Sequence, residues 1–220
     1  MGNDIIHKAE EYVRSFFASD FSGHDNDHTM RVYRTACRLA EEEGADMEIT
    51  ALAALLHDVD DRKISPETSE SKLNAERFLK KNGVPSERSE RILQAVKEVS
   101  FEGTDSVVPS TIEGKCVQDA DRLDALGAVG IGRAYAYGGS HHRRVHDPDE
   151  APVLNMNKEE YRSHVSTTVN HFYEKLFLLK DRMNTRSGRR TAEERDRFMH
   201  VFIERFLREW EGTDEEREDQ

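Results

Sequence analysis

His57 and Asp58 stand at the end of an apolar segment, residues 51–56, which reads ALAALL. Good helix formers fill this segment, so it predicts a helix that is buried on most sides. An unpaired charge is costly to bury, so His57 and Asp58 must open into a pocket or meet a charged partner. A divalent metal ion satisfies that requirement, because imidazole and carboxylate groups are both metal ligands.

Further ligand types stand in two other predicted helices. His28 is in the first turn of the helix predicted over residues 27–43. A later predicted helix carries Asp119, Asp121 and Asp124, of which the last two share a face because they are three residues apart. Asp119 points elsewhere. Two histidines and two carboxylates suit octahedral Mn, Fe, Co, Ni or Mg better than they suit a thiolate zinc site.

The elements that must position these groups all read as helices. Apolar residues at helical spacing predict helices over residues 4–19, 27–43, 46–57, 73–81, 86–99, 111–126, 157–183 and 191–211. Capping boxes are expected at Ser110 with Glu113, Asn157 with Glu160 and Thr191 with Glu194. Gly44 and Asp46 are expected to cap the ends of two helices, and the Phe198, Phe202 and Phe206 stripe is expected to pack in the core.

No strand pattern and no repeat interrupts this series, so the sequence predicts one all-α domain. We expect it to span residues 1–212, with an acidic tail over 213–220. A small-residue stretch, residues 127–136, leads toward a long charged loop over residues 140–155. That stretch and the C-terminal helix are the surfaces that a homodimer could use.

Composition narrows the class of partner. The 220 residues include 44 acidic and 32 basic side chains, for a net charge of −12. This balance disfavours nucleic-acid backbone binding, which requires a basic face, but leaves room for an anionic small molecule. The sequence has no apolar run of membrane-spanning length and no secretory leader, and its two cysteines, Cys37 and Cys116, lack a metal-binding or disulfide spacing. We therefore expect a cytoplasmic protein without membrane attachment.

The ordered motifs resemble a known family. The segment HTMRV (residues 28–32), then His57-Asp58, then DADRLD (residues 119–124) are similar to the H…HD…D pattern of the HD-domain metal-dependent phosphohydrolases. The segments EKL (residues 174–176) and MNT (residues 183–185) also resemble the small stand-alone bacterial and archaeal HD hydrolases.

This resemblance implies a compact multi-helix bundle with a metal site in its helical core. The implied ligands of the divalent ion are His28, His57, Asp58 and Asp121. Asp121 is chosen over Asp119 because the family's ligand is the aspartate of an Ala-Asp-Arg or similar segment.

Further site residues are expected around these ligands. Asp61 lies one helical turn beyond the HD pair and could take a proton from metal-bound water or orient it; the alternative is a surface carboxylate at a helix end. Lys63 and Arg122 could neutralise phosphate oxygens, and the alternative for each is a salt bridge, to Asp60 or Asp124.

Several other charged groups have two possible roles. His24, four residues before His28, could contact substrate or only the backbone. His141 and His142 belong to the predicted loop, and solvent exposure is the favoured interpretation. The cluster Arg186–Arg190 could meet a polyphosphate tail, although ordinary surface charge is the simpler interpretation.

The implied activity is hydrolysis of a phosphate ester or anhydride by metal-activated water, with a nucleotide as the favoured substrate and phosphate or pyrophosphate as product. One alternative is a regulatory module that binds metal and nucleotide without turnover. A second is an iron oxygenase, but the additional histidine ligands that such proteins carry are missing near the core motif. A two-metal phosphodiesterase of the same family is disfavoured because no histidine follows Asp61 until His141. The sequence does not distinguish the base, the sugar, the number of phosphates or the native metal.

Overall fold

The computed structural model describes residues 2–18, 25–62, 64–99 and 107–213, in which helices are joined by turns and loops and no β-strand occurs. The predicted all-α fold is therefore confirmed. The elements, in chain order, are α1 (Gly2–Phe16), α2 (Asn26–Glu43), α3 (Met47–Leu56), α4 (Leu73–Lys81), α5 (Ser86–Glu98), α6 (Ile112–Asp124), α7 (Gly127–Ser140), α8 (Lys158–Ser163), α9 (Thr168–His171), the π-helix η2 (Phe172–Leu176), α10 (Phe177–Leu179), the 3-10 helix η3 (Lys180–Arg182) and α11 (Arg186–Glu211).

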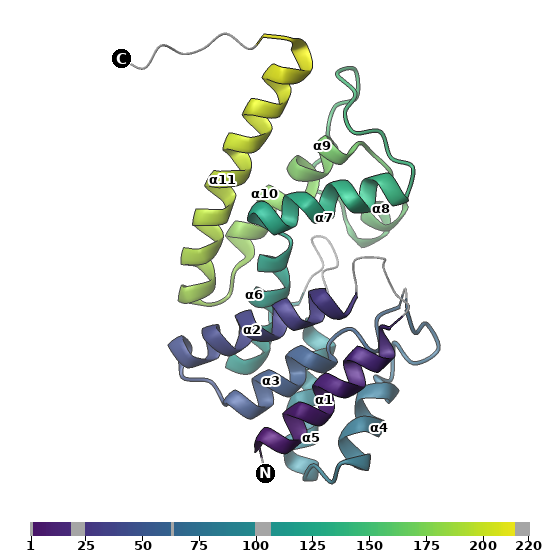
Figure 1. Cartoon of the computed structure of the whole chain (residues 1–220), viewed down its shortest axis with the longest axis vertical. Coiled ribbons are helices and arrows are strands. Elements are labelled where there is room, and N and C mark those ends of the chain that lie inside the picture. The colour runs from purple at the N-terminus through teal and green to yellow at the C-terminus, as the bar shows by residue number, and fades with distance from the viewer. Residues whose placement is uncertain (1, 19–24, 63, 100–106, 214–220) are drawn as a thin grey trace.

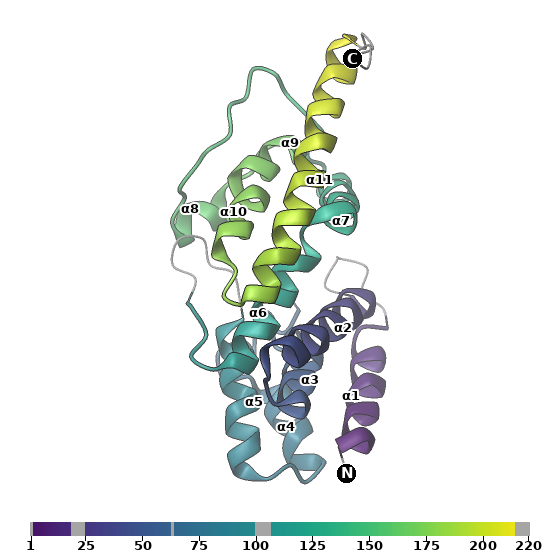
Figure 2. The same cartoon turned by 90° about the vertical axis from the view of Figure 1, so that its left-hand side faces the viewer.

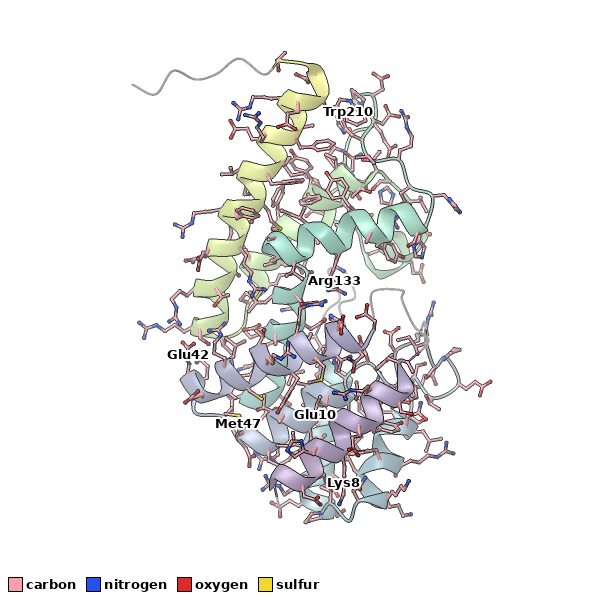
Figure 3. The ribbon with its side chains drawn as sticks, viewed as in Figure 1. Lys8, Glu10, Glu42, Met47, Arg133 and Trp210 are labelled. Carbon is pink, nitrogen blue, oxygen red and sulfur yellow. The ribbon has the colours of Figure 1, made fainter. Side chains whose placement is uncertain are left out.

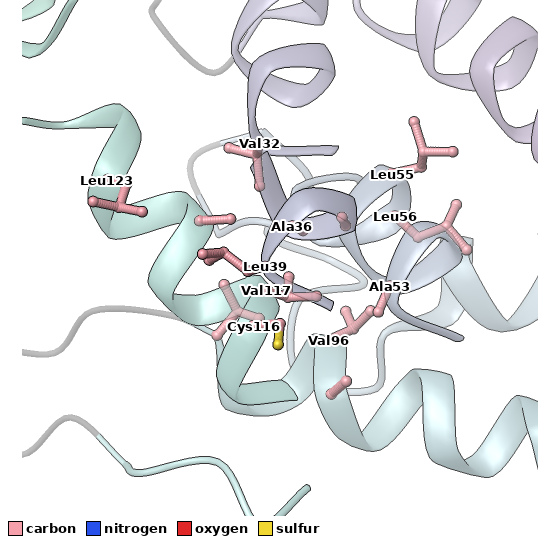
Figure 4. Close-up of a cluster of buried hydrophobic side chains, with 14 of the residues drawn as sticks. Val32, Ala36, Leu39, Ala53, Leu55, Leu56, Val96, Cys116, Val117 and Leu123 are labelled. Atoms are coloured by element: carbon pink, nitrogen blue, oxygen red, sulfur yellow. The ribbon is translucent and has the colours of Figure 1, made fainter. Parts of the chain in front are cut away.

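The N-terminal half is built around α3. Every residue of this helix from Ile49 to Leu56 is buried, as its short and apolar side chains require. Helices α1, α2, α5 and α6 all contact it. Figure 4 shows the part of this core in which Leu39 of α2, Val117 of α6 and Ala53 of α3 come together. Small residues on α3 allow the neighbouring helices to approach closely, so its polar end is held among them.

Local capping sets where α2 and α3 begin and end. The Asp25 side chain accepts a hydrogen bond from the His28 amide and caps α2 at its N-terminus. Gly44 ends α2 in the left-handed conformation, with φ of 70°. The Asp46 side chain accepts from the Ile49 amide and caps α3. The caps predicted at Gly44 and Asp46 are confirmed.

The C-terminal half lies at the other end of α6. In both overall views α7, α9, α10 and α11 form an upper group, α1 to α5 form a lower group, and α6 runs between them (Figures 1 and 2). Helix α11 contacts α7, α6 and α2, so it packs against both groups. No described helix combines the length and the apolar character that a membrane span requires.

The single helix predicted over residues 157–183 is wrong. The capping box of Asn157 and Glu160 opens α8 as expected, but α8 ends at Ser163. Thr167 then caps a new helix through its side chain, and the amide of Thr168 donates to the Arg144 carbonyl instead of to its own helix. The apolar residues keep helical spacing across the break, so the pattern does not reveal that Thr167 begins a new helix.

Two other predicted helix starts are displaced. Helix α11 begins at Arg186 behind the N-cap Thr185, and Thr191 lies inside it, so the predicted box at Thr191 is wrong. At α6 the cap is Thr111, while Ser110 bonds to Glu98. In both cases a neighbouring threonine offers the better acceptor for the helix amides.

The predicted phenylalanine stripe is only partly correct. Phe202 and Phe206 pack against the core, but Phe198 is half exposed. The stripe has four-residue spacing, which drifts around the helix and turns its first member outward.

Candidate metal centre

Three buried side chains meet where α2 and α3 approach each other. The Nε2 atoms of His28 and His57 each lie 3.3 Å from the same oxygen, Oδ2 of Asp58. The Nε2 atom of His28 is also 3.5 Å from Oδ1 of Asp121. Ligand atoms that share one ion at about 2.1 Å lie roughly 3.0 to 3.5 Å apart in octahedral or tetrahedral geometry. The spacing of His28, His57 and Asp58 therefore fits a single metal ion, and Asp121 stands next to His28 at the edge of this cluster.

Each group reaches this point from a defined position in the fold. His28 stands three residues after Asp25, the N-cap of α2. The backbone amide of His28 donates a hydrogen bond to the Asp25 side chain, which holds the first turn of the helix. His57 is the C-cap residue of α3, and Asp58 belongs to the turn that follows. Asp121 comes from α6, and its side chain is about a quarter exposed, with 27% of its surface accessible. Three helix segments that are distant in sequence thus converge.

The second nitrogen of each imidazole fixes which atom faces the cluster. Nδ1 of His28 is 2.7 Å from Oδ2 of Asp124, and Nδ1 of His57 is 2.8 Å from the Ala54 carbonyl oxygen. Both acceptors require a proton on Nδ1, which leaves the Nε2 lone pairs directed at Asp58. Nε2 of His57 is buried and makes no hydrogen bond within the described residues. This donor set fits a divalent ion.

The electrostatics of the cluster also favour a cation. Burial by itself lowers the pKa of His57, but the charge of Asp58, whose carboxylate lies 3.3 Å from Nε2, and the charge of Asp121 outweigh it and raise the pKa to about 9. The pKa of His28 is raised as well, since hydrogen bonds with Asp124 and Asp58 outweigh burial. Neutral imidazoles cannot balance the negative charge of these carboxylates. Either protons on the histidines or a metal ion can balance that charge.

Asp124 organises the far side of His28. Its Oδ2 accepts from His28, and the carboxylate is also bonded by Nε and Nη2 of Arg31, at 2.7 and 3.0 Å, and by Nη1 of Arg133, at 2.7 Å. Burial alone would raise the pKa of Asp124, but these cationic donors hold it well below its usual range. The residue therefore stays ionised and supports the His28 ring.

Sequence reasoning placed Asp124 only as a neighbour of Asp121 and missed both arginines. Arg31 had a usable signal, since it follows His28 by three residues and shares its helix face. Arg133 had none, because it stands in the glycine-rich α7 and meets Asp124 only through the turn between α6 and α7.

The segment after the HD pair is tied to α4. Asp60 is fully buried, and its two oxygens accept from the amides of Asn74 and Ala75 in the first turn of α4. This carboxylate caps a helix. The Asp61 amide donates to the Asp58 carbonyl at 3.0 Å, so Asp61 closes the turn that begins at Asp58, and it is partly buried.

The other predicted site residues are placed as follows. Arg122 is buried, and a terminal nitrogen donates to the Arg182 carbonyl; burial lowers its pKa. Arg122 is not among the side chains gathered at Asp58. Asp119 accepts from Asn184 and Thr185, away from the histidines. Lys63 and His24 lie outside the described residues.

The two loop histidines and the Arg186–Arg190 cluster, for which the sequence allowed two roles, belong to the upper group of helices. His141 is the residue after α7, exposed, with its ring stacked on Tyr137 at 3.8 Å between centroids. His142 is exposed as well. The Arg186–Arg190 cluster belongs to the first turns of α11, where Arg190 pairs with Glu42 of α2.

Comparison with known proteins identifies the class. The HD domain profile matches residues 26–126, the part of the chain that contains the whole histidine and aspartate cluster. YpgQ of Bacillus subtilis, an uncharacterized protein, is 35% identical over 207 residues, which are 93% of each chain. The chain therefore belongs to the HD-domain family.

Solved structures agree in fold. A protein from Lactobacillus plantarum superposes with a TM-score of 0.83 at 37% identity, covering 95% of this chain and 98% of its own. An HD-superfamily hydrolase from Bacillus thuringiensis gives 0.74 at 39% identity, covering 96% and 99%. YpgQ, crystallised in complex with ADP, gives 0.75 at 32% identity, covering 97% and 99%. The predicted family is confirmed.

Proposed function

We propose that this protein is a metal-dependent phosphohydrolase that cleaves a phosphate ester or anhydride, with a nucleotide as substrate. The observation that carries the proposal is the convergence of two Nε2 atoms on Asp58 at 3.3 Å, each with its Nδ1 held by an acceptor. A divalent ion bound there would supply an acidified water and a Lewis acid for a phosphoryl oxygen. Membership of the HD family and the hydrolase relative support the same class.

Each nearby residue has a proposed task. His28, His57, Asp58 and Asp121 would hold the ion. Asp61, in the turn that begins at Asp58, would accept the proton of the attacking water. Lys63 and Arg122 would counter the charge of the phosphate oxygens; Arg122 is close enough to Asp121 for the charge of that carboxylate to act on its pKa.

The nucleotide assignment rests on a relative. YpgQ has been crystallised in complex with ADP and shares the fold over 97% of this chain. A net charge of −12 leaves few surfaces for an anionic ligand, so a metal centre flanked by arginines is the favourable place to bind a phosphate.

The test is release of phosphate and pyrophosphate from a panel of nucleotides with Mn, Mg, Co or Ni. Wild type is compared with Asp58→Asn, which keeps the shape of the side chain and removes its charge, and with Glu41→Gln, an exposed acid of α2, as the matched control. We expect metal-dependent release by wild type and Glu41→Gln, and at least about a thousand-fold loss in Asp58→Asn. Circular dichroism verifies that all three are folded.

The product distinguishes a nucleotidase from a pyrophosphohydrolase. Absence of release from every nucleotide by a protein that demonstrably binds metal would contradict the proposal and favour a regulatory module that binds without turnover.

A further inference from the structure

His141 is an exposed side chain that the structure nevertheless holds in one orientation. Its ring stacks on that of Tyr137, with 3.8 Å between the ring centroids and 21° between the planes. Its Nδ1 atom is 3.0 Å from the Tyr137 carbonyl oxygen and 2.9 Å from Oγ of Ser140. A carbonyl oxygen only accepts, so the proton of the neutral ring is on Nδ1. Stacking and hydrogen bonding together fix the plane of the ring.

The backbone at the end of α7 supports this stack. The amides of His141 and Arg143 both donate to the Gly138 carbonyl, at 3.2 and 2.9 Å. His142 has φ of 56°, and this left-handed residue turns the chain back at the helix end. The guanidinium carbon of Arg143 thereby comes to 5.3 Å from the centre of the Tyr137 ring. The ring on which His141 stacks is thus itself anchored, as a preorganised binding group requires.

The outer face of the His141 ring is accessible. Tyr137 covers one face of this ring, and no other ring within the described part of the chain lies against it. A flat ring that is already fixed loses little conformational freedom when a ligand covers it, so it is suited to stack on a planar group. A nucleobase is such a group, and base–aromatic stacking tolerates any base because every base has a π-face.

The stack begins on the side of α7 from which Arg133 reaches the metal centre. Arg133 stands one helical turn before Tyr137. Its Nη1 donates to Oδ2 of Asp124, which also lies 2.7 Å from Nδ1 of His28. Figure 3 shows Arg133 beneath α7, on the side that faces α2. From Arg133 to His141 the chain advances by about 12 Å along a helix axis. The base and the phosphates are at opposite ends of a nucleotide, so one molecule can contact both the stack and the centre.

We propose that the ring of His141 stacks on the base of the nucleotide substrate while the metal centre acts on its phosphates. This inference rests on the proposed function and narrows its substrate class to phosphates that carry an aromatic base. The contact depends on a flat ring and not on charge, so the carboxylates of the metal centre do not oppose it. A polyphosphate without a base would lack the contact altogether.

The binding test uses two probes that differ only in the nucleoside. One is α,β-methylene-ADP, in which the bridge between the phosphates cannot be hydrolysed, and the other is methylenediphosphonate. Calorimetric titration of the Mn-loaded protein compares wild type with His141→Ala and His141→Phe. We expect His141→Ala to weaken binding of α,β-methylene-ADP at least about five-fold and to leave that of methylenediphosphonate unchanged. His141→Phe should recover most of the affinity, because it keeps a flat ring. His7→Ala, at an exposed histidine of α1, is the control.

Turnover provides a second readout. With a nucleoside triphosphate we expect His141→Ala to raise KM at least about five-fold with a smaller change in kcat, because stacking on the base is the same in the ground state and in the transition state. With tripolyphosphate as substrate, KM should not change. The affinity for Mn should be equal in all variants, since no proposed ligand is altered, and circular dichroism verifies that each is folded.

The outcomes separate the two proposals. Hydrolysis of nucleotides with unchanged affinity for α,β-methylene-ADP in His141→Ala would overturn the role of His141 and leave the phosphohydrolase in place. Binding that depends on the His141 ring, in a protein that hydrolyses no nucleotide, would support the role of His141 and overturn the phosphohydrolase. Equal weakening of methylenediphosphonate, or no recovery in His141→Phe, would show that the imidazole binds through its nitrogens and not by stacking; either result contradicts the inference.

Discussion

Asp119 and Asp124 are five residues apart on α6, both are buried, and their pKa values shift in opposite directions. Burial raises the pKa of Asp119, and hydrogen bonds from Asn184 and Thr185 only partly oppose it. Burial acts on Asp124 as well, but His28, Arg31 and Arg133 reverse its effect. Equal burial therefore does not decide the state of a carboxylate; the charge of its donors does.

This difference distinguishes a carboxylate that holds helices together, Asp119, from one that supports the proposed metal centre, Asp124. Asp119 accepts from the amides of Asn184 and Thr185, from the Asn184 side chain and from the Thr185 hydroxyl, at 2.7 to 3.1 Å. All these donors are neutral, and they belong to the segment that begins α11. Asp124 holds a histidine of the proposed metal centre and two arginines. One face of α6, at Asp119, thus anchors the C-terminal helices, and another, at Asp124, supports the site.

Removal of the Asp119 carboxylate should have the largest effect on stability. Asp119→Ala leaves several buried donors at the start of α11 unsatisfied, and we expect the free energy of unfolding to fall by about 3–5 kcal/mol. Urea denaturation followed by circular dichroism measures it. Asp181→Ala, at an exposed aspartate of η3, is the control and should change little. A loss below about 1 kcal/mol would show that the anchor is not Asp119.

Asp124→Asn should instead act on the metal. The substitution keeps the size of the side chain but removes the charge that supports the His28 ring, so we expect the affinity for Mn to fall about 10–100-fold. Calorimetric titration measures it, with Asp181→Asn as the control. If the metal affinity were unchanged while stability fell as much as in Asp119→Ala, the contrast between Asp119 and Asp124 would be lost.

Gly188 provides an independent probe of the Asp119 contacts. A Cβ atom at this position would lie 2.4 Å from Oδ2 of Asp119 and 2.7 Å from Oγ1 of Thr185. Gly188→Ala therefore forces the carboxylate out of its hydrogen bonds, and we expect a loss of about 1–3 kcal/mol in urea denaturation. Gly139→Ala, where a Cβ would meet nothing within 4 Å, is the matched control. Equal stability of the two variants would contradict this account of the contact.

The smallest expected effect is a change in the rate at which the two cysteines are alkylated. Burial, with added charge from Asp119, raises the pKa of Cys116 to about 12, and burial raises that of Cys37 to about 11. Because only the thiolate reacts, both cysteines should resist iodoacetamide at pH 8 and react faster as the pH rises. In Asp119→Ala the structure around Cys116 should open more often, so mass spectrometry should find faster alkylation of this cysteine. Asp124→Asn should show no such increase. Equal rates in both variants would be evidence against a separate anchor.

Local signals in the sequence were sufficient for the lower group of helices. The caps at Gly44 and Asp46 satisfy helix ends within a few residues of themselves, and the segment over residues 51–56 can only be a buried helix. The same local logic failed over residues 157–183, where the hydrogen bond from Thr168 to the Arg144 carbonyl competes with the helix. A partner 24 residues away is not visible in the local pattern.

By itself, the sequence determined the helical class, the family and the residues that can bind a metal, because periodicity, caps and an ordered motif depend on neighbours along the chain. Only the tertiary structure decided that Nε2 of His28 and of His57 meet at Asp58, and that Asp124 joins His28 to Arg133. Those contacts cross between helices, and their geometry depends on how α2, α3, α6 and α7 pack. Packing of a shared core, and not any local preference, brings the charges of this site together.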